Sequence, residues 1–450
     1  MVGTKKILVI VVTFLFALNY IWFGFDAFSG FFLFFIISSV FFNLVTKTNS
    51  LFLIIMIYFY LWLLWGNLTY NIFSTIWIID GDIVMVNNMY SLFIFTFSIL
   101  GFLFVKNQES LFEKSKFELD WDFSLKKAIF FTKILIGLHL VFFLPNISLG
   151  IEENYSDFSQ NIALRVPFIN RLIYIYPIFL ILTYLRFQKN ELSLKWLIWN
   201  IFISSLVLTL TGSRFLLMTT MICLFFIHII LLKRLEKKLN PKLILYGGIF
   251  VGLIYFIVPL LRASTVTESN QTELANEYFV IFTKFGGEFR DGVWSTKALS
   301  EASKELISNH YLETVFFPLF PKPLISLLGL DYNIVFEMTS SVIMANSIDV
   351  EVKGIRIGGV LELFYWNGYL GVIIGSILLF IISNVAIKQL YGNNSVSSIA
   401  MYSYLLILPF YFSFAQSNLL FTPLISFYLL FLIIYFFSKN KNEKSIILDA

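Results

Sequence analysis

The sequence contains little cysteine, histidine and charge, and each shortage argues against a class of protein. One residue of 450 is cysteine, so an intramolecular disulfide framework cannot form. This lone thiol and three widely spaced histidines argue against a structural zinc site. Charged residues make up only 13%, and the net charge of +4 is too small to indicate a nucleic-acid partner. We therefore expect no metal, no cofactor and no nucleic acid.

Apolar residues dominate the composition. The apolar fraction is 58% and includes 54 phenylalanines, more than a water-soluble fold can bury. A membrane-spanning helix needs about 20 mostly apolar residues, and twelve runs approach that length. They are residues 7–25, 28–45, 50–67, 84–105, 128–146, 172–187, 196–211, 215–232, 243–260, 360–387, 397–415 and 418–438. We predict an all-α polytopic membrane protein with about twelve transmembrane helices.

The first run resembles a signal sequence, because it follows Lys5 and Lys6. No small-x-small cleavage site follows the run, so we interpret it as an uncleaved span.

The predicted spans form two groups around one long loop. Residues 1–260 hold nine spans with short links, residues 360–438 hold three, and residues 439–450 form a tail. Residues 261–359 form the loop, and helical apolar spacing over 270–285 and 291–309 predicts that it is a partly helical cap.

Basic residues predict the orientation of these spans. With the N-terminus in the cytoplasm, 20 of the 32 Lys and Arg residues fall in cytoplasmic links and 11 fall outside. The positive-inside rule then places both termini in the cytoplasm and the long loop outside.

Arginine alone shows the opposite bias. Only Arg186 and Arg234 of eight arginines fall on the predicted cytoplasmic side. The external ones are Arg165, Arg171, Arg214, Arg262, Arg290 and Arg356. Because the planar guanidinium binds phosphate or carboxylate at two points, the set indicates an anionic ligand at the outer face. For each arginine singly, snorkelling or pairing with external acids remains an open alternative.

Two short polar stretches are candidates for contact with that ligand. Thr211-Gly212-Ser213-Arg214 lies between two spans, where Ser213 would cap a helix beginning at Arg214. Free amides at that helix end, beside a guanidinium, suit a pyrophosphate, and the alternative is an interfacial anchor. Residues 286–292 combine Glu288, Arg290 and Asp291 with three glycines, which indicates a tight, polar backbone region. Its alternative is a solvated turn between two loop helices.

A third stretch, residues 358–371, carries a carboxylate at the outer edge of a span. Glu362 lies there among apolar and aromatic residues, and an ionisable group in the membrane is costly and therefore a functional candidate. Gly368 and Gly371 are expected to let another helix approach closely. The alternative role for Glu362 is pairing with Arg356 at the interface.

In order and layout these elements resemble the Wzy-type O-antigen and capsular polysaccharide polymerases over most of the chain. The resemblance is carried by Gly212-Ser213-Arg214, Arg262, Gly287-Glu288-Phe289-Arg290-Asp291, Arg356, and Glu362 with Gly368-Tyr369-Leu370-Gly371. It implies a GT-C-like architecture in a bacterial inner (cytoplasmic) membrane. It also implies a metal-independent, inverting glycosyltransferase that joins oligosaccharide repeat units carried on undecaprenyl pyrophosphate, in O-antigen (lipopolysaccharide) or capsule biosynthesis.

The chemistry of the reaction that the resemblance implies suggests roles for these residues, as expectations. Glu362 and Arg290 would be catalytic, with Glu362 as base. Arg214, Arg165, Arg262 and Arg356 would bind the pyrophosphate of the lipid-linked oligosaccharide. Membrane lipid and a chain-length regulator are the further candidate partners.

Two alternatives stay open. A lipid-linked oligosaccharide flippase or other transporter would suit twelve spans, although transporters usually place charged residues near the bilayer midplane and these spans are nearly free of charge. An O-antigen ligase would share the architecture, but a histidine is expected ahead of its glycine pair, where this sequence has Glu362.

Overall fold

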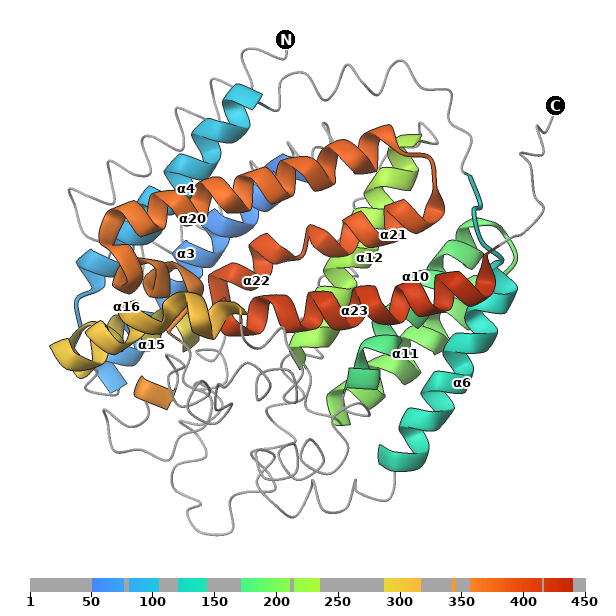
Figure 1. The fold of residues 1–450 in the computed structure, drawn as a ribbon, viewed down its shortest axis with the longest axis horizontal. Coiled ribbons are helices and arrows are strands. Elements are labelled where there is room, and N and C mark those ends of the chain that lie inside the picture. Colours follow the sequence, from blue (N-terminus) through green and yellow to red (C-terminus); the bar gives the residue numbers. More distant parts are fainter. Residues whose placement is uncertain are drawn as a thin grey trace. The chain divides into compact units, whose positions relative to one another are not determined.

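The computed structural model describes residues 51–76, 81–104, 120–143, 171–210, 214–234, 287–316, 342–344, 357–414 and 417–439. Within these ranges the chain is mostly helical and contains no strand, only two isolated bridges. Its helices are α3 (Leu51–Ile76), α4 (Ile83–Phe104), α6 (Leu125–Phe143), α10 (Ile175–Gln188) preceded by the 3-10 turn η3 (Leu172–Tyr174), α11 (Leu194–Leu210), α12 (Arg214–Arg234), α15 (Gly287–Ala298), α16 (Glu301–Phe316), α20 (Gly359–Gly392), α21 (Val396–Leu405), α22 (Leu408–Phe414) and α23 (Ser417–Ser438). Figure 1 shows them along the chain.

Most of the predicted apolar runs coincide with helices. The runs 7–25, 28–45 and 243–260 lie outside the described residues, and the other nine of the twelve each match one helix or one pair of helices. In the described part of the chain, two helical segments are both long and apolar enough to cross a membrane. They are Ile83–Gly101, with 19 residues, and Gly359–Gly392, with 34.

The run 397–415, predicted as one helix, is two helices. α21 ends at Leu405 and α22 begins at Leu408. Pro409 explains the break, because its ring clashes with the carbonyl of Leu405 four residues earlier and it has no N–H to donate.

The predicted helix 291–309 in the long loop is likewise divided. α15 ends at Ala298 and α16 begins at Glu301. Ser300 lies between them, and its hydroxyl accepts a hydrogen bond from the backbone N–H of Ser303 at 3.2 Å. A serine at this position satisfies an amide that the first turn of α16 leaves without a helical partner, so it favours a new helix start.

The chain divides into two compact units, each built from three separate stretches. Unit 1 comprises Met1–Glu113, Asn276–Ile387 and Leu408–Thr422, and unit 2 comprises Lys114–Ala275, Lys388–Ile407 and Pro423–Ala450. α20 and α23 each continue from unit 1 into unit 2.

Aromatic side chains form the core of unit 1. The rings of Phe52 and Phe97 stack with centroids 5.3 Å apart, and Phe93 stacks on Phe412 at 5.7 Å, which joins α3, α4 and α22. The hydroxyl of Ser376 in α20 donates to the backbone oxygen of Phe93 at 2.9 Å. At Gly101 an added Cβ would come within 1.7 Å of the Phe52 ring, so the absence of a side chain lets α3 and α4 approach.

A buried pair of amides explains why α3 extends beyond the predicted end at residue 67. Asn67 donates its side-chain amide to the backbone oxygen of Leu63, one turn earlier. Asn67 and Asn87 also exchange hydrogen bonds, each 2.9 Å long, between α3 and α4. Because these contacts satisfy the polar group, Asn67 does not end the helix.

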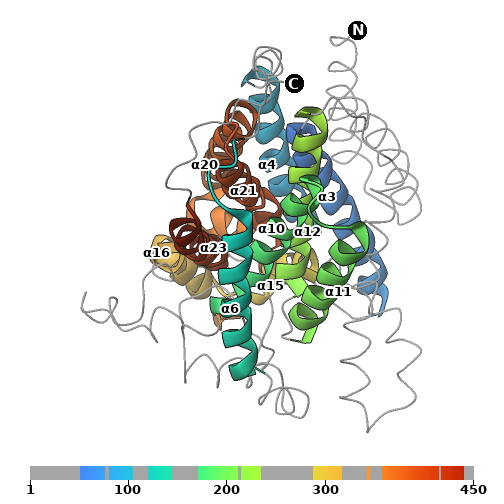
Figure 2. The ribbon, with the colours of Figure 1, turned by 90° about the vertical axis from the view of Figure 1, so that its right-hand side faces the viewer.

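Unit 2 is centred on α10, whose residues 175–185 are all buried. Figure 2 shows α6 to one side of α10 and α11 to the other. The segment before α6 joins distant stretches of this unit. The backbone N–H of Asp120 donates to the carbonyl of Asn394 at 2.9 Å, and that of Ser124 donates to the carbonyl of Ser438 at 2.8 Å. Backbone hydrogen bonds therefore hold the beginning of α6 to the end of α23.

Candidate functional site

Helix α15 is anchored in unit 1 by a fully buried aromatic ring. The Phe289 ring lies 5.9 Å, centroid to centroid, from both Trp62 of α3 and Tyr90 of α4. A Cβ at Gly66 would come within 2.6 Å of that ring, so glycine is needed for the ring to lie on α3. This anchor fixes the position of the residue that follows, Arg290.

Arg290 is held by the next residue. Its Nε and Nη2 atoms both donate to one carboxylate oxygen of Asp291, at 3.0 and 2.7 Å. The Asp291 side chain is 8% exposed and that of Arg290 is 25% exposed. A buried carboxylate paired with a partly exposed guanidinium orients the cation while leaving part of it accessible.

Residues 287–292 form the first turns of α15, so the alternative of a solvated turn between two loop helices is wrong within the described chain. The reason is a tertiary contact. A Cβ at Gly292 would lie 3.1 Å from the backbone oxygen of Ile357 and 3.2 Å from a methyl carbon of Leu361. Gly292 therefore serves close packing of α15 against the beginning of α20, and a helix interior tolerates one such glycine.

This packing brings two of the predicted motifs together. Beyond Gly292, the Ser295 hydroxyl of α15 lies 2.9 Å from the Tyr365 hydroxyl of α20, a contact between residues 70 positions apart. Glu362 lies one turn before Tyr365, in the first turn of α20, and is 4% exposed. Arg290 and Glu362 thus belong to two helices that pack on each other within unit 1.

The helix that carries Glu362 is short, because α20 is broken after two turns. Asn367 has φ −150° and ψ 36°, and Gly368 has φ 57° and ψ −149°. After this break a Cβ at Gly371 would come within 2.2 Å of the backbone oxygen of Leu363. In this part of the chain nothing lies within 4 Å of a Cβ at Gly368, whereas Gly371 allows the short helix on the other side of the break to approach closely.

Helix α16 contacts the same short segment from another direction. The Ser308 hydroxyl donates to the backbone oxygen of Trp366 at 3.1 Å. The rings of Tyr311 and Trp366 stack with centroids 5.3 Å apart and planes 24° apart. Residues 359–366 are therefore held by both α15 and α16.

The other predicted site residues, the arginines expected to bind pyrophosphate, lie outside the described residues or in unit 2. Arg165, Arg262 and Arg356 lie outside the described residues, as does the proposed cap Ser213. Helix α12 does begin at Arg214, as predicted, and belongs to unit 2. Their role in pyrophosphate binding stays a prediction.

Sequence reasoning missed the residues that join α15 and α16 to α20. Ser295, Ser308 and Tyr311 are ordinary helix residues, and no local spacing distinguishes them. A weak signal existed in Gly292 and Ser295, which are three positions apart and therefore share one helix face.

Paired aspartates in the sequence serve as helix caps where the structure describes them. Asp82, the second of Asp80-Gly81-Asp82, accepts a hydrogen bond from the backbone N–H of Met85 at 2.9 Å. Asp122 accepts hydrogen bonds from the hydroxyls of Ser395 and Ser397 at the beginning of α21. Within the described ranges no group of three or more His, Cys, Asp or Glu side chains is arranged to hold a metal ion.

Comparison of the chain with family models, curated proteins and solved structures gave no match.

Proposed function

We propose that this protein is a membrane-embedded polymerase that joins oligosaccharide repeat units carried on undecaprenyl pyrophosphate. The observation that carries the proposal is the packing of α15 on the first turn of α20. Two polar motifs that the Wzy-type resemblance treats as functional, far apart in sequence, are neighbours in unit 1. One supplies a partly accessible guanidinium and the other a buried carboxylate.

The proposal includes a topology. The chain crosses the bacterial cytoplasmic membrane about twelve times, with both termini in the cytoplasm and residues 261–359 at the outer face. The lengths of α4 and α20 support a membrane location. The apolar side chains exposed on α6, among them Phe130, Ile134, Leu138 and Val141, suit contact with lipid better than contact with water.

The proposed reaction is an inverting glycosyl transfer. A hydroxyl oxygen of the acceptor sugar attacks the anomeric carbon of the donor, and the bond from that carbon to the pyrophosphate oxygen breaks. The acceptor proton passes to the Glu362 carboxylate, which acts as base. Undecaprenyl pyrophosphate leaves with the bonding electrons, and the Arg290 guanidinium stabilises the charge that develops on it.

Asp291 has a defined part in this scheme. Since both Nε and Nη2 of Arg290 donate to it, Asp291 sets the plane of the guanidinium before substrate binds. A preoriented cation needs little reorganisation as the leaving group becomes charged, and this is the condition under which electrostatic stabilisation is most effective.

The test is deletion of the gene in its host, followed by gel analysis of surface polysaccharide. A polymerase deletion should leave a single repeat unit on the surface lipid, a flippase deletion none, and a ligase deletion polymer that is not attached. Complementation with Glu362→Gln, which keeps the shape of the side chain and removes the base, should restore no ladder, because base catalysis typically contributes ~10²–10⁴ in rate.

Glu305→Gln is the matched control, because it makes the same change at an exposed position of α16 and should restore a normal ladder. A full ladder from Glu362→Gln at equal protein amounts would exclude Glu362 as the base. Loss of all surface repeat units on deletion would instead favour the flippase.

A further inference from the structure

Beyond the residues already assigned, the contact between α15 and α20 contains a hydroxyl pair whose hydrogen-bond direction is fixed. The Ser295 hydroxyl donates its single proton to the backbone oxygen of Gly292 at 2.7 Å. It can therefore only accept from Tyr365, 2.9 Å away, so the Tyr365 hydroxyl is the donor. Ser295 is fully buried and the contact as a whole is partly buried, which limits the access of water to the bond.

We propose that the Ser295–Tyr365 hydrogen bond is a positioning clamp that holds the short helix 359–366 in register with α15, and so holds Glu362 in place relative to Arg290. The inference rests on the proposed function, since it concerns the geometry of that site. Ser295 and Tyr365 are positioning residues, because they act through the two helices and do not touch the substrate.

The spacing along each helix supports this assignment. Ser295 lies five residues after Arg290, which is about 7.5 Å along α15, and Tyr365 lies three residues after Glu362, about 4.5 Å along α20. The clamp is therefore within two turns of both candidate groups. Packing at Gly292 fixes how closely the helices approach, whereas a directional hydrogen bond fixes their rotation and sliding.

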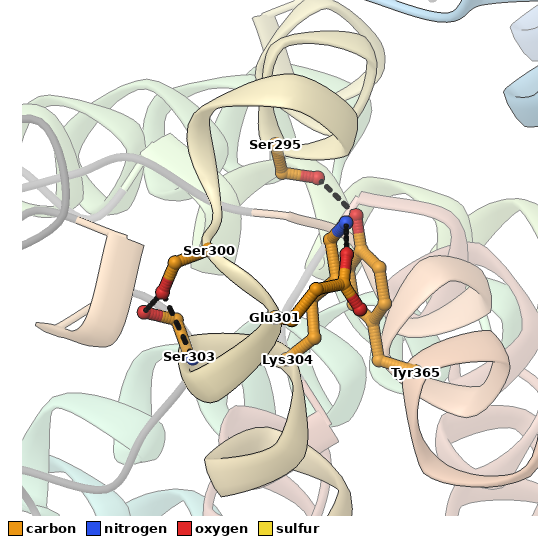
Figure 3. Close-up of polar contacts among 6 residues, drawn as sticks. All are labelled: Ser295, Ser300, Glu301, Ser303, Lys304 and Tyr365. Atoms are coloured by element: carbon orange, nitrogen blue, oxygen red, sulfur yellow. Dashed lines mark hydrogen bonds and ion pairs between the residues drawn. The ribbon is translucent and has the colours of Figure 1, made fainter.

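The short helix needs such a clamp because its connection to the rest of α20 is a break. At Gly368 the backbone has φ 57° and ψ −149°, so no continuous helix transmits the orientation of the long segment to residues 359–366. The orientation of Glu362 then depends on contacts with α15 and α16. Figure 3 shows that the Glu301–Lys304 ion pair of α16, 2.8 Å long, lies beside the Tyr365 hydroxyl and adds to the polar surroundings of the clamp.

The same region contains a matched control. Ser300 and Ser303 form a second hydroxyl pair, 2.9 Å long, at the exposed beginning of α16. Ser303→Ala removes that contact and leaves the Ser300 oxygen able to cap α16 through the backbone N–H of residue 303. The substitution is chemically the same as Ser295→Ala but leaves the Ser295–Tyr365 hydrogen bond in place.

The experiment compares Ser295→Ala, Tyr365→Phe, the double variant and Ser303→Ala, each purified as the full chain in lipid nanodiscs. Because small displacements of reacting groups are costly, each single variant should lower kcat for polymerisation about tenfold, with KM within about twofold. The double variant should be no worse than the poorer single variant, since both remove one bond. Ser303→Ala should keep the normal kcat.

Hydrogen exchange provides a measurement that does not depend on activity. Loss of one buried hydrogen bond should speed exchange of amides 359–366 by roughly two- to tenfold in Tyr365→Phe, with no change in Ser303→Ala.

Normal kcat in both clamp variants, together with an inactive Glu362→Gln, would overturn the clamp and leave the proposed function standing. A rise in KM at constant kcat would also overturn it, because it would indicate direct substrate binding. A wild-type protein that makes no polymer would overturn the proposed function. In that case the exchange rates of amides 359–366 alone would test whether Ser295 and Tyr365 hold the short helix.

Discussion

Replacement of Gly368 by alanine tests whether the break in α20 depends on glycine. The backbone at Gly368, with φ 57° and ψ −149°, lies in a region that residues with a Cβ rarely occupy. Apart from its two chain neighbours, no heavy atom of the described residues lies within 4 Å of the place that a Cβ would take at this position, so the substitution adds backbone strain and no clash with them. The effect of the change can therefore be attributed to conformation alone.

The expected magnitude follows from two opposing terms. Holding a non-glycine residue in such a conformation costs about 1–3 kcal/mol. Alanine also restricts the unfolded chain, which returns about 0.4–1 kcal/mol. We expect Gly368→Ala to lower the free energy of unfolding by roughly 1–2 kcal/mol. Where the strain is instead relieved by straightening α20, residues 359–366 would lose their contacts with α15 and α16, and kcat for polymerisation would fall.

Gly137→Ala is the matched control. Gly137 lies inside helix α6, and a Cβ there also meets no described residue within 4 Å, but its backbone is helical. Alanine should therefore stabilise the protein by about 0.5–1 kcal/mol. The two variants should differ by about 2 kcal/mol, or roughly 30-fold in the unfolding equilibrium, in denaturant titrations of the detergent-solubilised protein. Equal stability of the two variants would refute the reasoning.

Two further predictions concern charge. Arg290→Lys should shorten polymer ladders nearly as much as Arg290→Ala at matched protein amounts. The reason is that a lysine has one charged nitrogen and cannot replace the two donors, Nε and Nη2, that Arg290 presents to Asp291. A full ladder from Arg290→Lys would mean that only the positive charge matters. Reporter fusions at Lys238 and Lys304 should report opposite sides of the membrane, because the distribution of basic residues predicts that Lys238 is cytoplasmic and Lys304 external. If both fusions report the same side, the predicted topology is wrong.

The positions of the helices followed from the sequence because each apolar run is a local property. The predicted runs 84–105 and 215–232 differ by only one or two residues at each end from α4 and α12. Hydropathy is enough to locate these two helices, since burial or lipid contact stabilises every apolar residue along the run. Helix ends were less predictable where a polar residue found a partner, as Asn67 did in Asn87.

The candidate site was only partly predictable, because its geometry depends on contacts between distant residues. Glu362 and Arg290 were candidates from residue type and neighbours. The role of Gly292 in helix packing could not be predicted, because its packing partners, Ile357 and Leu361, follow more than sixty positions later. No rule of local spacing links Ser295 to Tyr365, so the clamp could be recognised only in three dimensions.

The division of the chain into interleaved stretches has a consequence for how the protein is made. Each unit takes its last stretch from the C-terminal part of the chain, Leu408–Thr422 for one and Pro423–Ala450 for the other. Because a ribosome synthesises the N-terminal residues first, both units lack part of their helix packing until α22 and α23 have been made. A premature stop codon directly after Ile407 would therefore remove residues from both units at once.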